Sequence, residues 1–530
     1  MLKNKLSKKI LSLLIAAYIF TAFCNVEGYA AVKVSPLPEL GSDSAVLYTI
    51  NNSKDIISHN SAEKKYPVSM AKLMNAIIVI ENADTGADFR PKQTEKVTVG
   101  YEIEAIGHDY KLAGFKVGDV VSVPDLLTAM IVCDADDAAI ILARYIGRKV
   151  LGGVADSLYK YDRKAIDHFV DMMNSRAELI GLNSTMFGNA TGFKGGHISF
   201  STASDIARIS AVYLRYPFLC EISRISSKDY WDVKGKAPIG STDGETPELS
   251  DADIARTKLW VNQNELINID GKYFYEGCKG VMASYGQRTY EVDDYNGDTK
   301  NDFVTIDYAV ASAYVEFNGI KMIAVAYGKT ADDVFGDITS MIEYVKENYV
   351  LHTYTESYQK VTSFHVENAM DPSNAHLEVI TERGGTYLSR IDELHLFNHV
   401  IKINPAYSVP TEDNLYETYI SPPAGITKGD IVGTMDIYYN AMYIDSVVLY
   451  AGNTVPVYEP LPDINGSTWE FSDLFKIIYD MGVVALIILI LHFTLKIFIK
   501  IRRHKIEMRR YSGKRKKRPA RRYSKAKRIR

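Results

Sequence analysis

Apolar residues recur along the chain at two different spacings, which predict strands and helices in alternation. Period-two or short continuous apolar runs indicate strands, and recurrence every three to four residues indicates helices. The predicted strands are 45–50, 55–58, 274–282, 306–315 and 321–326, and the predicted helices are 67–80, 124–131, 138–146 and 336–349. This order predicts a mixed domain over residues 31–352, with a largely antiparallel sheet and helices on its faces.

After the mixed domain the pattern changes to short strands and turns, which predicts a β-sandwich over residues 353–460. A polar linker at 461–476 precedes an apolar run at 477–499 that is long enough for one transmembrane helix. Residues 1–30 combine a basic start, an apolar core and small residues before Ala30, which is typical of a secretory signal peptide.

Charge is divided unevenly between the body and the C-terminal tail, residues 500–530. From residue 501 onward there are sixteen Lys and Arg and one Glu, which leaves 45 basic and 64 acidic residues elsewhere, a net charge of −19. The positive-inside rule places this tail in the cytoplasm and the body outside. We expect the tail to attract anionic lipid rather than nucleic acid. The predicted location is the cell membrane, crossed once.

Four cysteines give no disulfide framework. Cys24 lies in the predicted leader, so an odd number, three, remains. Their spacing fits no zinc site, and we expect no metal and no cofactor. Cys133 and Cys278 are compatible with a disulfide or with two buried thiols, and the sequence leaves both open.

The segment 67–78, Pro-Val-Ser-Met-Ala-Lys-Leu-Met-Asn-Ala-Ile-Ile, carries the clearest candidate chemistry. Ser69 and Lys72 are three residues apart at the start of a predicted helix, so both side chains lie on one face. A hydroxyl beside an amine is an activated nucleophile where burial lowers the lysine pKa. Free N–H groups at the helix start suit a developing oxyanion. The same spacing occurs elsewhere in the chain, so spacing alone does not identify a site.

The surroundings of Ser69 resemble the D-alanyl-D-alanine carboxypeptidases, the low-molecular-mass penicillin-binding proteins. In that family a hairpin leads to a helix opening with Pro-x-Ser-Met-x-Lys-Leu-Met, which matches residues 67–74. The similarity continues in order through the segments 115–119, 125–127, 189–192, 201–205, 343–344 and 426–434. It implies the α/β (α+β) fold of penicillin-binding proteins and serine β-lactamases, followed by a β-rich accessory domain.

The resemblance also implies acyl transfer at the D-Ala–D-Ala end of a peptidoglycan stem peptide, with β-lactams as covalent ligands. By position, Ser69 would be the nucleophile and Lys72 the base. The family's third motif, Lys-Thr-Gly, would place Lys279 and Gly280 at the substrate.

The second and third motifs are both altered. The family's Ser-x-Asn falls on Asp134 and Asp136 at the candidate substrate site, and an ionised carboxylate only accepts hydrogen bonds and would hold a neighbouring lysine charged. The acidic link 133–137 could also simply cap the following helix. In the third motif, an alignment without a gap places Gly280 at the position of the Thr and Val281 at the position of the Gly. If one residue is deleted, Gly280 aligns with the motif Gly. The Thr hydroxyl is missing in both registers.

Two functional hypotheses follow. In the first, the protein is a working serine carboxypeptidase of altered efficiency that uses Ser69, Lys72 and Lys279. In the second, it binds wall peptide or a protein partner without turnover, and its acidic residues form a salt-bridge cluster with the lysines. A structural membrane anchor without a ligand is a third class that the predicted span and tail allow.

Overall fold

The structure is a computed structural model of the chain. It describes residues 34–106, 110–153, 162–192, 199–229, 259–292, 302–367, 369–407, 419–420, 422, 425–458 and 471–513. The predicted signal peptide, most of the predicted linker and the tail beyond residue 513 lie outside the described residues.

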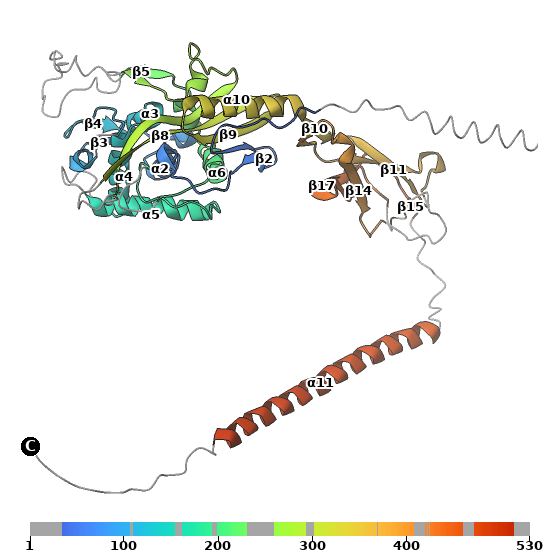
Figure 1. The fold of residues 1–530 in the computed structure, drawn as a ribbon. Coiled ribbons are helices and arrows are strands. Elements are labelled where there is room, and N and C mark those ends of the chain that lie inside the picture. Colours follow the sequence, from blue (N-terminus) through green and yellow to red (C-terminus); the bar gives the residue numbers. More distant parts are fainter. Residues whose placement is uncertain are drawn as a thin grey trace, which may run out of the picture.

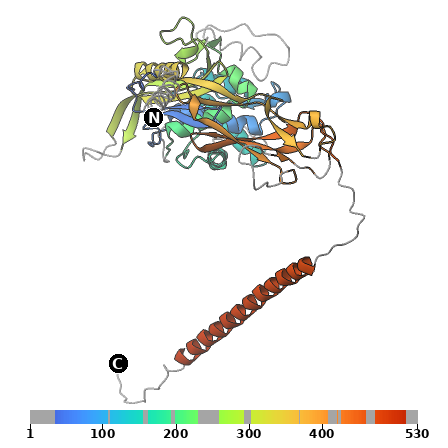
Figure 2. The same ribbon diagram turned by 90° about the vertical axis from the view of Figure 1, so that its right-hand side faces the viewer.

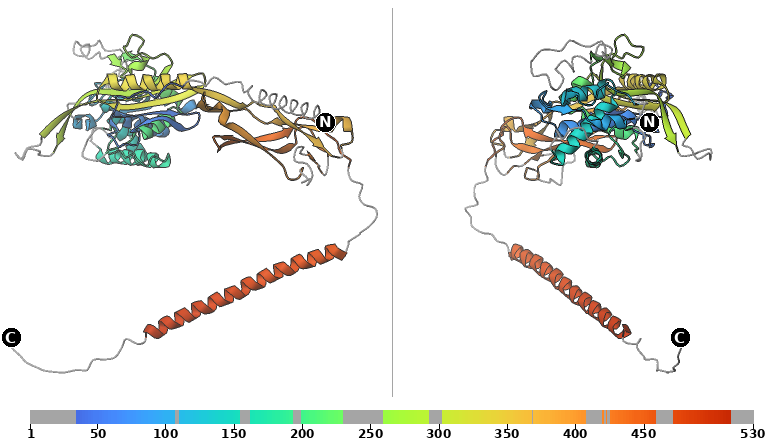
Figure 3. Two further views of the ribbon diagram at one scale, coloured as in Figure 1. Left: turned by 45° about the vertical axis from the view of Figure 1, so that its right-hand side comes forward. Right: turned by 90° about the vertical axis from the view of Figure 1, so that its left-hand side faces the viewer.

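A five-stranded sheet in the order β2-β1-β9-β8-β7 forms the centre of the first unit. Its strands are β1 (Ser44–Thr49), β2 (Lys54–His59), β7 (Cys278–Val292), β8 (Asp302–Phe317) and β9 (Ile320–Gly328). Every neighbouring pair is antiparallel. The β7–β8 hairpin extends beyond the rest of the sheet (Figure 3). Strand β7 is an edge strand, so one side of it is open to other elements.

Helices lie on both faces of this sheet. Helix α10 (Ala331–Asn348) packs on one face, and α2 (Ala71–Asn82) and α6 (Ala203–Tyr213) lie on the other (Figure 1). The remaining elements of this unit are η1 (Val68–Met70), η2 (Ala87–Phe89), β3 (Lys96–Thr98), η3 (Tyr101–Ala105), β4 (Val120–Ser122), α3 (Val123–Val132), α4 (Asp136–Val150), α5 (Arg163–Leu179), α7 (Pro217–Ile222), β5 (Ser227–Asp229), β6 (Leu259–Val261) and η4 (Glu265–Ile267). An antiparallel sheet covered by helices confirms the predicted fold class.

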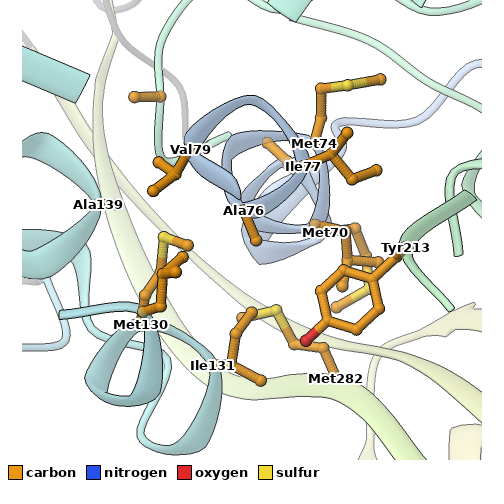
Figure 4. Packing of buried hydrophobic residues seen from close by; sticks show 14 of the residues in the cluster. Met70, Met74, Ala76, Ile77, Val79, Met130, Ile131, Ala139, Tyr213 and Met282 are labelled. Carbon is orange, nitrogen blue, oxygen red and sulfur yellow. The ribbon is translucent and has the colours of Figure 1, made fainter. Parts of the chain in front are cut away.

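Helix α2 is the central helix of the core. Ten of its twelve residues are buried, because its sequence is apolar on nearly every side and must be surrounded by other elements. In Figure 4, Met74 of this helix points away from Ile131 of α3, Tyr213 of α6 and Met282 of β7, so apolar neighbours lie on more than one side of the helix. Each large side chain buried in this way contributes about 1.5–3 kcal/mol. The packing fixes the position of the residues at the start of α2.

The C-terminal part of the body is β-rich. Its strands are β10 (Tyr349–Thr355), β11 (Lys360–Val366), β12 (His376–Thr381), β13 (Gly385–Arg390), β14 (Phe397–Ile403), β15 (Tyr419–Ile420), β16 (Ile431–Tyr439) and β17 (Met442–Ala451), with η5 (Pro372–Asn374) and η6 (Leu394–Leu396) between them. Six of them form one sheet, in the order β14-β16-β17-β12-β11-β15, and β10 pairs with β13. The side chain of Asn52 bonds the backbone of Leu388, which joins β13 to the first unit.

The last element is the helix α11 (Phe471–Gly513), drawn in red in Figure 2. Within it, Gly482–Arg502 is long and apolar enough to cross a membrane, and none of this span is buried against the rest of the described chain. The span overlaps the predicted transmembrane segment 477–499.

Candidate active site

Ser69 lies in the single turn η1, directly before α2, on strained backbone. Val68 has φ 50°, a conformation that costs a β-branched residue about 1–3 kcal/mol. Gly192 packs so closely against this turn that an added Cβ would lie 1.8 Å from the Val68 carbonyl oxygen. The backbone around the serine is therefore held in place from both sides.

The hydroxyl of Ser69 is buried in a polar cluster. Its Oγ donates a hydrogen bond to Asp134 Oδ2 at 2.8 Å and lies 3.0 Å from Ser284 Oγ. Ser284 Oγ donates to the same Asp134 oxygen at 2.5 Å. All three side chains have no exposed surface. The carboxylate of Asp134 thus joins the first motif to the edge strand β7.

Lys72 is held between two carboxylates. Its Nζ donates to Asp134 Oδ1 at 2.5 Å and to the Asp134 carbonyl oxygen at 2.8 Å, and it lies 2.7 Å from Asp136 Oδ1. Burial alone lowers the pKa of Lys72, but the two carboxylates outweigh burial and raise it above the usual value. Burial raises the pKa of Asp134, but the ammonium groups of Lys72 and Lys111 outweigh it and lower that pKa to about 2. Lys72 is therefore a cation and Asp134 an anion at neutral pH.

Asp136 and Asp137 begin helix α4 and accept hydrogen bonds from the loop at residues 111–115. Asp136 Oδ2 accepts from the backbone N–H of Lys111 and from Arg288 Nη2, both at 2.9 Å. Asp137 accepts from the N–H groups of Ala113 and Gly114 at 3.0 Å, and burial raises its pKa. The N-cap residue of α4 is Ala135, whose side chain makes no capping hydrogen bond. Capping alone therefore does not account for the acidic link 133–137.

Three residues of this cluster were not predicted: Lys111, Ser284 and Arg288. Lys111 Nζ lies 3.2 Å from Asp134 Oδ2 and from Ser284 Oγ. Ser284 and Arg288 are separated by an even number of positions on β7, so the period of two places both on one face of the strand. With β7 recognised as the edge strand, this alternation would have predicted that both residues face the site. Lys111 reaches the site through the loop that Asp136 and Asp137 bind, and we find no sequence signal for it.

Lys279 and Gly280, which the third motif would place at the substrate, lie outside the cluster around Ser69. The ammonium of Lys279 pairs with Glu316 at 2.5 Å on the half-exposed side of β7 and β8. A bulge in the pairing of β7 with β8 spans Cys278 to Val281, and it shifts the register before the strand reaches the site. Gly280, at φ 92°, lies against the Ser223 carbonyl, where a Cβ would come within 2.3 Å.

No disulfide joins the thiols of Cys133 and Cys278, which answers the question left open by the sequence. Burial raises the pKa of Cys278 to about 11, so this thiol is unreactive at neutral pH. In the part of the chain that the structure describes, no group of three or more His, Cys, Asp or Glu side chains is placed to hold a metal ion.

Comparison with known proteins supports the family suggested by the Ser69 segment. Residues 30–274 match the family described as D-alanyl-D-alanine carboxypeptidase. The D-alanyl-D-alanine carboxypeptidase DacF of Bacillus subtilis is 22% identical over 72% of this chain and 82% of its own length. The carboxypeptidase DacD of Escherichia coli is 32% identical over 37% of this chain and 47% of its own length. Penicillin binding protein 5 from Haemophilus influenzae matches 80% of this chain and 100% of its own, with a TM-score of 0.50 and 17% identity.

Residues 30–274 of the chain are thus similar to the D-alanyl-D-alanine carboxypeptidase family, and the chain has a penicillin-binding fold. By family resemblance it is a serine-type D-Ala–D-Ala carboxypeptidase-like protein. The chain spans most of DacF but about half of the Escherichia coli relative. The family match includes Ser69, Lys72, Asp134 and Asp136 but ends before Lys279 and the strand β7.

Proposed function

We propose that this protein binds peptidoglycan stem peptides ending in D-Ala–D-Ala at the Ser69 site, and that acyl transfer there is slow or absent in the ion-paired arrangement described above. Ser69 is the candidate nucleophile and Lys72 the candidate base, as the family resemblance implies. Asp134 and Asp136 are the residues that set their protonation.

The observation that carries this proposal is the ammonium of Lys72 between the carboxylates of Asp134 and Asp136. A protonated lysine cannot remove the proton of Ser69, and general-base assistance accounts for about 10²–10⁴-fold of rate in enzymes of this kind. Asp134 accepts the hydrogen bond of Ser69, but a carboxylate with a pKa near 2 is a poor base for a hydroxyl at neutral pH. The cluster therefore favours binding over turnover.

The same proposal covers the partners of the protein and its location. A leader at residues 1–30, a span within α11 and a basic tail together support a body outside the membrane and a tail in the cytoplasm. The tail then meets anionic lipid. β-Lactams carry a carboxylate and a strained cyclic amide, which resemble the terminal carboxylate and the peptide bond of the stem-peptide end, and they are proposed as ligands of the same site.

A fluorescent penicillin tests the proposal on the full chain in detergent. We expect little labelling of Ser69 at pH 7 during a time in which an active family carboxypeptidase is fully labelled, and no release of D-Ala from a stem-peptide mimic. The Ser69→Ala variant gives the background. Rapid labelling that maps to Ser69 and disappears in Ser69→Ala would overturn the proposal of slow transfer.

The second candidate function is a working carboxypeptidase, and one observation favours it. Ser69 keeps its place at the start of α2 on strained backbone, and stored strain of this kind is common at functional sites. In this case ligand entry would have to separate Lys72 from one of its carboxylates. Release of D-Ala in the experiment above selects this candidate.

A further inference from the structure

In the ion pairs around Ser69, the cluster holds more cations than carboxylates. Its ion pairs join three cations, Lys72, Lys111 and Arg288, to two carboxylates, Asp134 and Asp136. The nearby Asp137 carboxylate instead accepts hydrogen bonds from backbone N–H groups of the 113–115 loop. A surplus positive charge in a buried site is costly unless an anion can reach it.

Lys111 is the member of this cluster that reaches the surface. Its side chain is 25% exposed, whereas Lys72, Asp134 and Asp136 have no exposure and Arg288 has 3%. Its ammonium also lies beside Asp134 and Ser284, the two groups that Ser69 Oγ contacts. A ligand that approaches Ser69 from solvent along this side therefore meets the ammonium of Lys111.

The contacts of Lys111 are suited to exchange. Its Nζ lies 3.2 Å from each of four acceptors: Asp134 Oδ2, Gln263 Oε1, Ser284 Oγ and the Tyr285 carbonyl oxygen. These distances are long for a charge-assisted bond, which is typically 2.7–2.9 Å. A carboxylate that arrives from solvent can replace one or more of these acceptors at little cost. Tyr285 lies on the edge strand β7, so a peptide beside this strand would bring its end close to Lys111.

We infer that Lys111 binds the terminal carboxylate of the peptide ligand and so determines the preference of the site for a free C-terminus. The inference rests on the proposed binding of stem peptides at Ser69. It assigns this contact to a residue from the loop before α3, in place of the predicted Lys279, whose ammonium pairs with Glu316.

Paired peptides test this inference. A fluorescent stem-peptide mimic ending in D-Ala–D-Ala is prepared with a free carboxylate and with a carboxamide. Both are titrated by fluorescence anisotropy into the full chain in detergent, in a Ser69→Ala background that forms no acyl-enzyme. We expect the acid to bind about tenfold or more tightly than the amide, which is the ratio expected of one charge-assisted bond.

The variants Lys111→Met, Lys111→Arg and Lys279→Met distinguish binding from a structural role. The acid-to-amide ratio should fall close to one in Lys111→Met, with amide binding retained, and should persist in Lys111→Arg and Lys279→Met. Thermal unfolding of each variant checks the fold. If neither peptide binds before these changes, both this inference and the proposed peptide binding fail. If the peptides bind without a preference, if the preference survives Lys111→Met, or if that variant loses both peptides equally, the inference about Lys111 alone fails.

Discussion

The turn that carries Ser69 and Lys72 differs sharply from the elements that face it. The turn keeps the family pattern Pro-x-Ser-Met-x-Lys-Leu-Met and is anchored by the buried helix α2. The facing groups are Asp134 and Asp136, from the start of α4, and Ser284, on β7. Asp134 and Asp136 replace the Ser and Asn of the family motif, and Ser284 lies outside the predicted third motif.

This difference indicates that the family's Ser-x-x-Lys pattern can be retained while its lysine is held protonated. The serine and the lysine occupy suitable positions, yet the two carboxylates raise the pKa of Lys72 instead of letting burial lower it. The chemistry of a Ser-x-x-Lys pair therefore depends on residues more than sixty positions away in the chain, and the motif alone does not establish activity.

The largest expected effect comes from removing one carboxylate of the cluster. Asp136→Ala leaves Lys72 with one carboxylate and removes the ion pair of Asp136 with Arg288, so we expect a loss of about 3–5 kcal/mol in the free energy of unfolding. Urea unfolding of the full chain in detergent measures it. The control is Asp332→Ala, an exposed aspartate paired with Lys272, which should cost less than about 1 kcal/mol. Equal losses in the two variants would contradict a buried cluster that holds this site together.

Restoring the family residues tests whether Asp134 and Asp136 hold Lys72 protonated. The double variant Asp134→Ser with Asp136→Asn removes both charges that hold Lys72 protonated, so burial should lower the lysine pKa. We expect the rate of Ser69 labelling by a fluorescent penicillin to rise by about 100-fold. Thermal unfolding of the double variant checks that the fold is kept. An unchanged rate would move the cause from the carboxylates to Gly280 and Val281.

Acid should weaken the cluster in a defined pH range. The pKa of Asp134 is about 2 in the folded protein and 3.8 as its ordinary value, so its stabilising effect is present above pH 4 and is lost as the pH falls toward 2. The total loss from this group is about 2 kcal/mol. Urea unfolding at pH 5, 4 and 3 measures it. Asp134→Asn should flatten this pH dependence, and an equally steep dependence in that variant would assign the effect to other groups.

The smallest effect is expected at the predicted third-motif lysine. Lys279 pairs with Glu316 where both side chains are about one-third exposed, so Lys279→Ala should cost less than about 1 kcal/mol. The labelling rate of Ser69 should stay the same. A large loss of labelling would mean that Lys279 enters the site when a ligand binds. The contrast between the retained turn and the elements that face it would then be weaker.

Much of the fold could be predicted from local pattern. The hairpin β1–β2, helix α2 and the strands β8 and β9 lie close to their predicted ranges, because apolar periodicity and turn residues specify each of them locally. Ser69, Lys72, Asp134 and Asp136 were also predicted, since they lie in or next to recognisable motifs. The contact between these four residues confirms none of their proposed roles, which stay predictions.

The facing side of the site could not be predicted in the same way. The pairing of β7 with β8 is irregular between Cys278 and Val281, so a regular period of two cannot be carried from Lys279 to Ser284, and a one-residue change of register moves every side chain to the other face. Lys111 enters through tertiary hydrogen bonds between its loop and the start of α4. Neither feature has a local signature, because each depends on how distant segments meet.

The charge of Lys72 is the central claim, and its side-chain carbon reports that charge directly. The full chain, labelled with ¹³C at the lysine Cε positions and held in detergent micelles, can be titrated by NMR from pH 6 to 10. The Lys72 signal is assigned by its loss in Lys72→Arg. We predict an ammonium signal that does not titrate in this range, because the folded-state pKa lies above 10.5. A titration midpoint between pH 6 and 9 would contradict the account, since Lys72 would then be available as a base.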